Sequence, residues 1–178
     1  MPKKTHRSSH RKLQPPKIGR GAGAHAAFMR QALHLAEAGM HGGRGGPFGC
    51  VVVRRGRVVG RGNNRVTSTN DPTAHAEVVA IRDACDRLGT FHLEDCELYA
   101  SCEPCPMCLA AIYWARLPRV FYGNTRRDAA AIGFDDDFIY TQMPLPPHRQ
   151  KVKMKPLLRA EAQRAFAQWA AKTDKVRY

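Results

Sequence analysis

Residues 72–77 read Pro-Thr-Ala-His-Ala-Glu, and residues 101–108 read Ser-Cys-Glu-Pro-Cys-Pro-Met-Cys. In the second stretch two prolines mark the start of a helix, and the thiols of Cys105 and Cys108 stand three residues apart. Side chains three residues apart share one face of a helix, and the positive end of the helix dipole stabilises thiolate charge there. The spacing therefore predicts a pair of sulfur ligands for one metal ion.

His75, which we expect on the preceding helix, can add an imidazole nitrogen to these two sulfurs. Three protein ligands leave the fourth tetrahedral position of zinc open for water, whereas structural zinc sites are closed by four. Glu77 lies too close along the helix to share the metal with His75, but it can reach the water. Zinc lowers the pKa of bound water from about 15.7 towards about 7, and a carboxylate can pass the released proton to a leaving group. The pair H-x-E and P-C-x-x-C is the signature of zinc-dependent hydrolytic deaminases, with Glu77 as the catalytic proton carrier.

Two other interpretations of the cysteines stay open. Cys102 could complete a closed site of three cysteines and one histidine. It lies at the end of a predicted strand, however, and Pro104 restricts how the chain can bend back to the metal. A closed site would also leave Glu77 without a purpose. The second interpretation is a zinc-stabilised nucleic-acid-binding module without catalysis, which would also leave Glu77 without a role.

The length and composition of the chain predict a single globular domain. Its 178 residues can bury one core, and no apolar run approaches the roughly 18 residues needed to cross a bilayer. No apolar stretch typical of a secretory signal follows the basic N-terminus. We therefore expect a cytoplasmic protein with six reduced cysteines, of which Cys50 and Cys85 are buried core thiols.

The formal net charge of +14 is concentrated at the two ends of the chain. Residues 1–20 carry seven Lys or Arg and no acidic residue, and residues 149–178 carry nine against two, so each end is +7. Between them, thirteen basic and thirteen acidic residues cancel. A surface that binds many phosphates would carry its Lys and Arg around the active cleft. The distribution favours solvated basic tails and argues against a nucleic-acid partner.

Residues 1–24 form a basic tail whose composition cannot support packing, so the folded domain is expected over residues 25–178. Within it, apolar patterns of strand and helix period follow one another, and Asp71 or Thr73 can cap the second helix. Strands are predicted over 48–54, 57–63, 96–100, 120–122 and 138–142, and helices over 25–39, 73–88, 104–116, 128–132 and 160–172. This order predicts an α/β fold with helices on both faces of one sheet.

Several further stretches point to one family. They are Gly45-Gly46-Pro47-Phe48-Gly49, Asn63 to Thr67, Asn70 to Thr73, Gly133-Phe134-Asp135-Asp136 and Phe138-Ile139-Tyr140. Together with the metal motif, they resemble the bacterial guanine deaminases of the cytidine deaminase superfamily over nearly all of residues 26–178. The resemblance implies a three-layer α/β/α sandwich with a central mixed β-sheet, and one zinc ion per subunit. It also implies a homodimer whose subunits exchange their C-terminal segments, that is, a domain swap.

The resemblance further implies a reaction and its site residues. Guanine would be converted to xanthine and ammonia by addition of water at C2, a step of purine catabolism, while Glu77 delivers a proton to N3. Asn64 and Asp136 would bind the polar edges of the purine, and Asp136 would help to protonate the departing amine. The remaining substrate contacts that the resemblance implies are Phe48, Ala76, Trp114 and, from the other subunit of the dimer, Tyr178.

The residues themselves also allow simpler interpretations. Asn64 could end a strand in turn geometry, and any of the three consecutive aspartates at 135–137 could face inward. Phe48 and Trp114 could be core aromatics, and Tyr178 could be a frayed terminus. Because the whole superfamily shares the zinc motif, a tRNA adenosine deaminase or a cytosine-type deaminase stays an alternative function. The neutral middle of the chain argues against the tRNA substrate.

Overall fold

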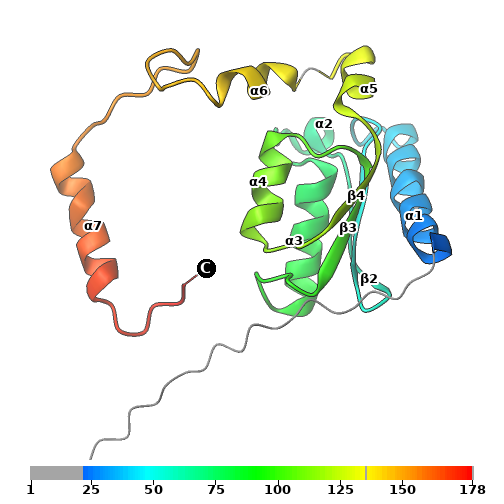
Figure 1. The fold of residues 1–178 in the computed structure, drawn as a ribbon, viewed down its shortest axis with the longest axis horizontal. Coiled ribbons are helices and arrows are strands. Elements are labelled where there is room, and N and C mark those ends of the chain that lie inside the picture. Colours follow the sequence, from blue (N-terminus) through cyan, green and yellow to red (C-terminus); the bar gives the residue numbers. More distant parts are fainter. Residues whose placement is uncertain (1–21, 135, 178) are drawn as a thin grey trace, which may run out of the picture.

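One mixed sheet organises the fold (Figure 1). Within residues 22–134 and 136–177, the parts of the chain that this computed structural model describes, four strands are ordered β2-β1-β3-β4. They are β1 Gly49–Arg54, β2 Arg57–Asn63, β3 Cys96–Cys102 and β4 Val120–Asn124. β1 pairs antiparallel with β2 and β3, whereas β3 and β4 are parallel. The expectation of a mixed sheet is confirmed.

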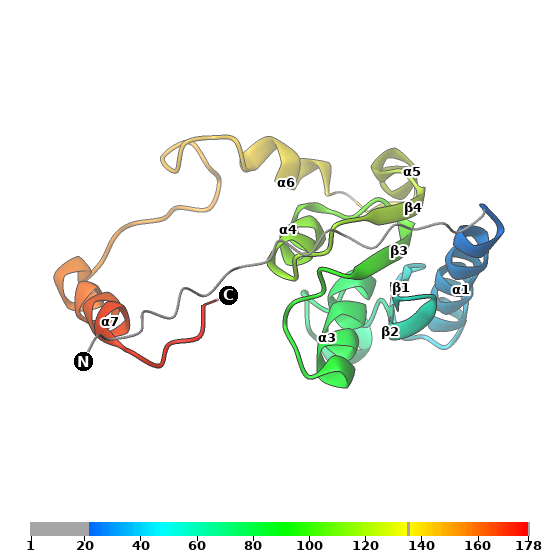
Figure 2. The same cartoon turned by 60° about the horizontal axis from the view of Figure 1, so that its bottom comes forward.

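Helices cover both faces of this sheet (Figure 2). One layer is α1 (Ala22–His41), and the other consists of α3 (Ala76–Leu88) and α4 (Pro106–Trp114). Because side chains alternate across a strand, β1 divides its buried residues between the two layers. Val51 and Val53 pack with Phe28 of α1. Cys50 and Val52 belong to the cluster formed with α3 and α4, so the three-layer sandwich is also confirmed.

Two glycines of β2 let α3 lie close against the sheet. A Cβ atom on Gly62 would come within 2.1 Å of the Ala76 carbonyl oxygen, and one on Gly60 within 2.3 Å of the Ala80 carbonyl oxygen. No side chain fits at such distances, which explains why these strand positions are glycine. The close contact holds the first turn of α3 directly over β2.

Helix α3 begins later than the predicted start at residue 73. It starts at Ala76, with His75 at the N-cap position in an extended conformation. Asp71 and Thr73, the expected caps, instead bond to each other, because Asp71 Oδ1 accepts hydrogen bonds from the N–H and Oγ1 of Thr73 at 2.8 and 2.6 Å. This turn follows α2 (Val66–Thr69), a short helix absent from the predicted elements. His75 therefore lies just outside the helix rather than on it.

The strand predicted over residues 138–142 is wrong. The segment forms helix α6 (Asp137–Gln142), which follows helix α5 (Arg126–Ala131). A short apolar run is compatible with both helix and strand, so its pattern could not decide between them. The helical turn predicted near α5 is present, and its start is set by a capping box between Thr125 and Asp128.

The C-terminal part of the chain leaves the sandwich. After α6 it runs through a segment with little regular structure to α7 (Arg159–Ala171), which stands apart from the sheet in both views (Figures 1 and 2). No residue of α7 is buried, and the rings of Phe166 and Trp169 are exposed. Tyr178 and residues 1–21 of the predicted tail lie outside the described residues, whereas residues 22–24 belong to α1.

All six cysteines are free thiols. Cys50 is buried as expected, but Cys85 of α3 is only half-buried. Within the described residues, no helix is both long enough and apolar enough to cross a membrane.

Candidate metal centre and active site

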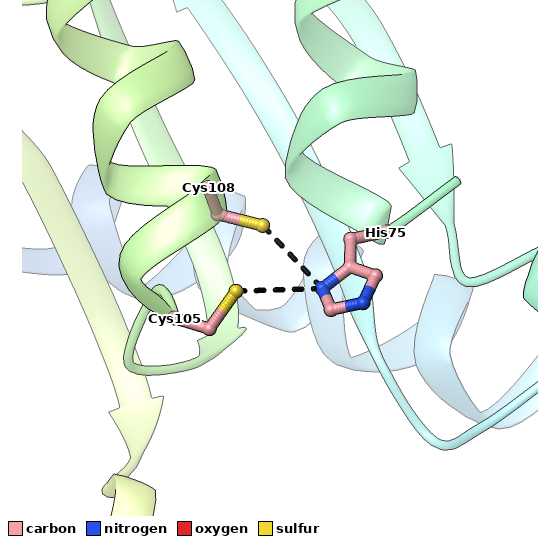
Figure 3. A group of neighbouring side chains, drawn as sticks. All are labelled: His75, Cys105 and Cys108. Carbon is pink, nitrogen blue, oxygen red and sulfur yellow. Dashed lines mark hydrogen bonds between the residues drawn. The ribbon is translucent and has the colours of Figure 1, made fainter. Parts of the chain in front are cut away.

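Three metal-binding side chains meet where α3 and α4 begin (Figure 3). Nδ1 of His75 lies 3.6 Å from Sγ of Cys105 and 3.5 Å from Sγ of Cys108. Cys105 is the N-cap residue of α4 and Cys108 lies in its first turn, so one helix start supplies both sulfurs. The structure thus brings together the three residues that the sequence spacing named as ligands.

The distances between these atoms fit a zinc ion. Zn–S bonds of about 2.3 Å and a Zn–N bond of about 2.05 Å at a tetrahedral angle place sulfur and nitrogen about 3.6 Å apart. The two separations in the structure, 3.5 and 3.6 Å, agree with this value. Two thiolates and one imidazole are also the donor types that zinc prefers, and three protein ligands are typical of catalytic zinc.

Hydrogen bonds among the ligands prepare the site for a cation. The Cys108 thiol donates to Cys105, and this bond, aided by His75, lowers the pKa of Cys105 to about 4 despite its burial. The same bond and burial raise the pKa of Cys108. The bond to Cys105 raises the pKa of His75. A metal ion that binds here displaces the protons held by Cys108 and His75 and meets a thiolate already formed at Cys105.

Cys102 does not join the metal-binding group formed within the described residues. Its Sγ lies 3.6 Å from the carbonyl oxygen of Thr125, to which it donates a weak hydrogen bond. Burial raises the pKa of its thiol to about 11, so the group stays protonated. The closed four-ligand alternative therefore has no support from this geometry.

Glu77 lies in the first turn of α3 and is only 7% exposed. Burial raises the pKa of its carboxyl, and the negative charge of Cys105 adds to the effect. A carboxyl whose pKa is moved towards neutrality can both take up and release protons, as general acid–base chemistry requires. Glu77 also lines the same cavity as His75 and Cys105.

That cavity has a volume of about 300 Å³ and mostly apolar walls. Its lining includes these residues named from the sequence: Phe48, Asn64, His75, Glu77, Cys105 and Asp136. Phe134, Glu103 and Ala129 also line it and were not predicted as site residues. A planar ring in this cavity would lie next to both the metal ligands and the proton carrier.

The amide of Asn64 has a defined orientation. Its Oδ1 accepts hydrogen bonds from the backbone N–H groups of Gly46 and Val66, at 3.3 and 3.2 Å. Because Oδ1 is engaged by the backbone, the Nδ2 group of this cavity residue is the one left to donate to a ligand. Gly45 lies behind the amide, and a Cβ atom there would come within 2.3 Å of Oδ1.

Two phenylalanines form an aromatic wall of the cavity. The rings of Phe48 and Phe134 meet edge to face, with their centroids 4.7 Å apart and an interplanar angle of 86°. Phe48 was expected in this wall, whereas Phe134 belongs to a stretch whose only signal was its resemblance to the family. Edge-to-face pairs are favourable arrangements of aromatic rings, so the wall is a stable flat surface.

Asp136 presents an unpaired acceptor to the cavity. It is the N-cap residue of α6, and its Oδ1 is buried without a hydrogen-bond partner among the described residues. Burial and the charge of Cys105 raise the pKa of its carboxyl, while Arg126 partly opposes this. Asp137 is exposed, and Asp135 lies outside the described residues. A buried carboxylate oxygen without a donor is costly, which favours a ligand that supplies one.

The other predicted substrate contacts have different outcomes. Ala76 is buried between His75 and Glu77 at the first position of α3. Trp114 does not line the cavity formed by the described residues: it is 63% exposed at the end of α4, where it lines a separate open hollow together with residues of the C-terminal segment. The helix carries it roughly 9 Å along its axis beyond Cys108, away from the metal ligands.

Fold and site together define a class of protein. An α/β/α sandwich carries a centre of one histidine and two cysteines, and residues 23–124 match the family model of the cytidine and deoxycytidylate deaminase zinc-binding region. The chain belongs to this family of zinc-dependent hydrolytic deaminases. Within the family it is 48% identical over 154 residues to guanine deaminase of Bacillus subtilis strain 168, covering 86% of this chain and 99% of that protein. The X-ray structure of guanine deaminase from Bacillus subtilis matches with a TM-score of 0.84, covering 86% of this chain and 98% of that one.

Two further relatives are more distant. A tRNA-specific adenosine deaminase of Aquifex aeolicus strain VF5 is 37% identical over 130 residues, which cover 73% of this chain and 84% of that protein. A solved mutant protein in complex with 8-azaguanine is 36% identical, with a TM-score of 0.61, and the match covers 63% of this chain and 65% of that one. One of these relatives is thus specific for tRNA, and the other was solved with a bound purine analogue.

Proposed function

We propose that this protein converts guanine and water to xanthine and ammonia, as a step of purine catabolism. The observation that carries the proposal is the position of Asp136, whose unpaired, buried Oδ1 faces a cavity beside the metal ligands. Guanine supplies N–H donors along its edge, and the Asn64 amide supplies a donor for a ring acceptor or carbonyl oxygen. The 48% identity to a guanine deaminase over nearly its whole length supports this substrate.

The side chains have distinct roles in the proposed reaction. When bound by His75, Cys105 and Cys108, zinc makes its water molecule acidic enough to lose a proton near neutral pH. Glu77 would take up that proton and pass it to N3 of the ring. It would then move the remaining proton of the hydroxyl added at C2 to the amino group, which leaves as ammonia. Asp136 holds the ring edge and assists in protonating the leaving group.

The cavity walls explain how the ring is held during these proton transfers. The ring of Phe48, supported by Phe134, offers an apolar surface to a planar base. Asn64 Nδ2 is a donor, so it fits an acceptor atom of the base, and Asp136 Oδ1 is an acceptor, so it fits an N–H group of the base. Ala76 is the buried residue between His75 and Glu77, both of which line the cavity.

We also propose a homodimer in which the subunits exchange their C-terminal segments. Helix α7 stands apart from the sandwich of its own chain, with Phe166 and Trp169 exposed. Trp114 and Tyr113 expose apolar surface on α4 as well. Burying these side chains between two copies would stabilise the assembly by the hydrophobic effect. Tyr178 and Trp114 would then contribute to the site only in the dimer.

The chemistry of the cysteines suits a reducing compartment, which supports a cytoplasmic location. All six are free thiols, and two of them are metal ligands in the proposal. An oxidising environment would favour disulfides in place of the zinc site.

The function is tested by measuring ammonia release from guanine, adenine, cytosine and a tRNA anticodon stem, with zinc-loaded protein at equal concentration. Release from guanine is expected, with xanthine as the second product. The Glu77→Gln variant serves as the control for contaminating deaminases, and it should release none. Activity on the tRNA stem with none on guanine would move the assignment to a tRNA adenosine deaminase, and activity on cytosine alone to a cytosine-type enzyme.

A further inference from the structure

We propose that Tyr140 is a positioning residue that sets the place of Asp136 in the cavity, and that Arg126 holds the Tyr140 ring. The inference rests on the proposed role of Asp136 as the acceptor for the base. It concerns a contact between α6 and the metal-binding turn, and neither Tyr140 nor Arg126 lines the cavity itself.

Tyr140 joins α6 to the turn that carries a metal ligand. Its hydroxyl donates a hydrogen bond of 3.3 Å to the carbonyl oxygen of Pro104. Pro104 directly precedes Cys105 and is buried, so this carbonyl belongs to the peptide unit that leads into the ligand. A movement of α6 relative to the metal centre would therefore have to break or stretch this bond.

Asp136 and Tyr140 lie one helical turn apart at the start of α6. The N–H of Tyr140 donates to the carbonyl oxygen of Asp136 at 3.4 Å, and that of Ile139 donates to the same oxygen at 2.9 Å. A six-residue helix is not stable alone, so its position depends on contacts with the rest of the fold. No residue of α6 is buried, and Phe138 and Ile139 are exposed. Tyr140, which is half-buried, is therefore a main anchor of the helix.

Arg126 connects the same ring to a second point on the metal-binding turn. Its guanidinium lies 4.6 Å from the centroid of the Tyr140 ring, in cation–π contact. Its backbone N–H donates to Oε2 of Glu103 at 3.1 Å, and the N–H of Glu103 donates to the carbonyl oxygen of Asn124 at 2.8 Å. Arg126 thus fixes the ring from the α5 side, while Pro104 holds its hydroxyl.

The inference is tested by a double-mutant cycle between Tyr140→Phe and Asp136→Asn, measured on the base that the wild-type enzyme deaminates. Tyr140→Phe removes only the hydroxyl, and a lost hydrogen bond of this kind should lower kcat/KM by about tenfold. In the Asp136→Asn background the same change should lower it by less than about twofold, because the side chain that Tyr140 positions is already disabled. Zinc content should stay unchanged in all four proteins. Tyr122→Phe, at an exposed tyrosine of β4, is the matched control and should have no effect.

Arg126→Gln extends the cycle, with Arg127→Gln at the neighbouring exposed arginine as its control. Arg126→Gln should lower kcat/KM in the wild-type background and add little to Tyr140→Phe. The inference would be overturned if the fold-loss of kcat/KM in the double variant equalled the product of the losses in Tyr140→Phe and Asp136→Asn. It would also be overturned if Tyr140→Phe kept the kcat/KM of the wild type. Deamination of another base in place of guanine would overturn the proposed function alone, because the coupling between the two residues is measured on whichever base reacts.

Discussion

The backbone N–H of Gly46 donates to Oδ1 of Asn64 at 3.3 Å, and this bond turns the amide so that its nitrogen is left for the cavity. The N–H of Val66 donates to the same oxygen at 3.2 Å. Two fixed donors on one oxygen make the amide a directed donor towards a ligand, without the usual freedom to rotate between donor and acceptor. The two glycines at 45–46 therefore help to orient the Asn64 amide: Gly46 donates to its oxygen, and Gly45 leaves room for it.

Gly45→Ala should impair recognition of the base without loss of the metal. The new Cβ atom would lie 2.3 Å from Oδ1 and 2.7 Å from the backbone oxygen of Asn64, so Asn64 must shift. We expect KM for guanine to rise and kcat/KM to fall at least about tenfold. A tenfold fall corresponds to a loss of about 1.4 kcal/mol of binding free energy. Steady-state kinetics measure the effect. Gly23→Ala, where a Cβ meets nothing within 4 Å, should leave kinetics unchanged.

Glu77→Gln should keep zinc and lose turnover. The amide has nearly the same shape as the buried carboxyl, but it cannot take up a proton from water. General acid–base groups contribute typically about 10²–10⁴-fold, and we expect kcat to fall by at least this much. Metal analysis and kcat are measured on one preparation, with the exposed Glu94→Gln as control. Retained turnover in a zinc-loaded Glu77→Gln protein would remove the proton-carrier role.

The cysteines should separate into ligands and a non-ligand. Cys108→Ser should reduce zinc content and activity together, because hydroxyl oxygen is a poorer zinc donor than thiolate and Cys108 faces His75 at 3.5 Å. Cys102→Ser should retain one zinc per subunit, since its thiol bonds to the Thr125 carbonyl oxygen. A chelator should inactivate the wild type, and added zinc should restore it. Loss of zinc from Cys102→Ser would revive the closed four-ligand site.

Removal of the residues after Ala171 should abolish most of the deaminase activity if the C-terminal segment completes the site of a second subunit. The decisive form of this experiment co-expresses two inactive chains, a full-length Glu77→Gln chain and a truncated chain with an intact metal site. If the segments are exchanged, the full-length chain completes the intact site of the truncated chain in each mixed dimer. About half of the dimers are mixed and each has one working site of two, so about a quarter of wild-type activity should return. Without exchange, the mixed dimer should stay inactive. Light scattering checks that both preparations are dimeric.

The sequence could predict most of the fold because most of its elements carry strong local signals. The helical spacing of α1 extends over a long segment, where period distinguishes helix from strand, and the valine-rich apolar run of β1 favours a strand. The segment 138–142 is short, and tertiary contacts made by Tyr140 hold it as a helix. The first turn expected for α3 was lost to a competing local bond between Asp71 and Thr73.

The sequence by itself determined the chemistry available at the metal centre. Cys105 and Cys108 are three residues apart at the start of one helix, a spacing that brings their thiols together. Glu77 follows His75 by only two residues, which keeps the carboxyl in the same short segment as the imidazole. Only the tertiary structure decided which aspartate faces the cavity, that Phe134 backs Phe48, and that Trp114 points elsewhere within its own chain. The reason is physical: local spacing sets relations within one or two turns, whereas these side chains come from separate elements whose relative positions depend on packing.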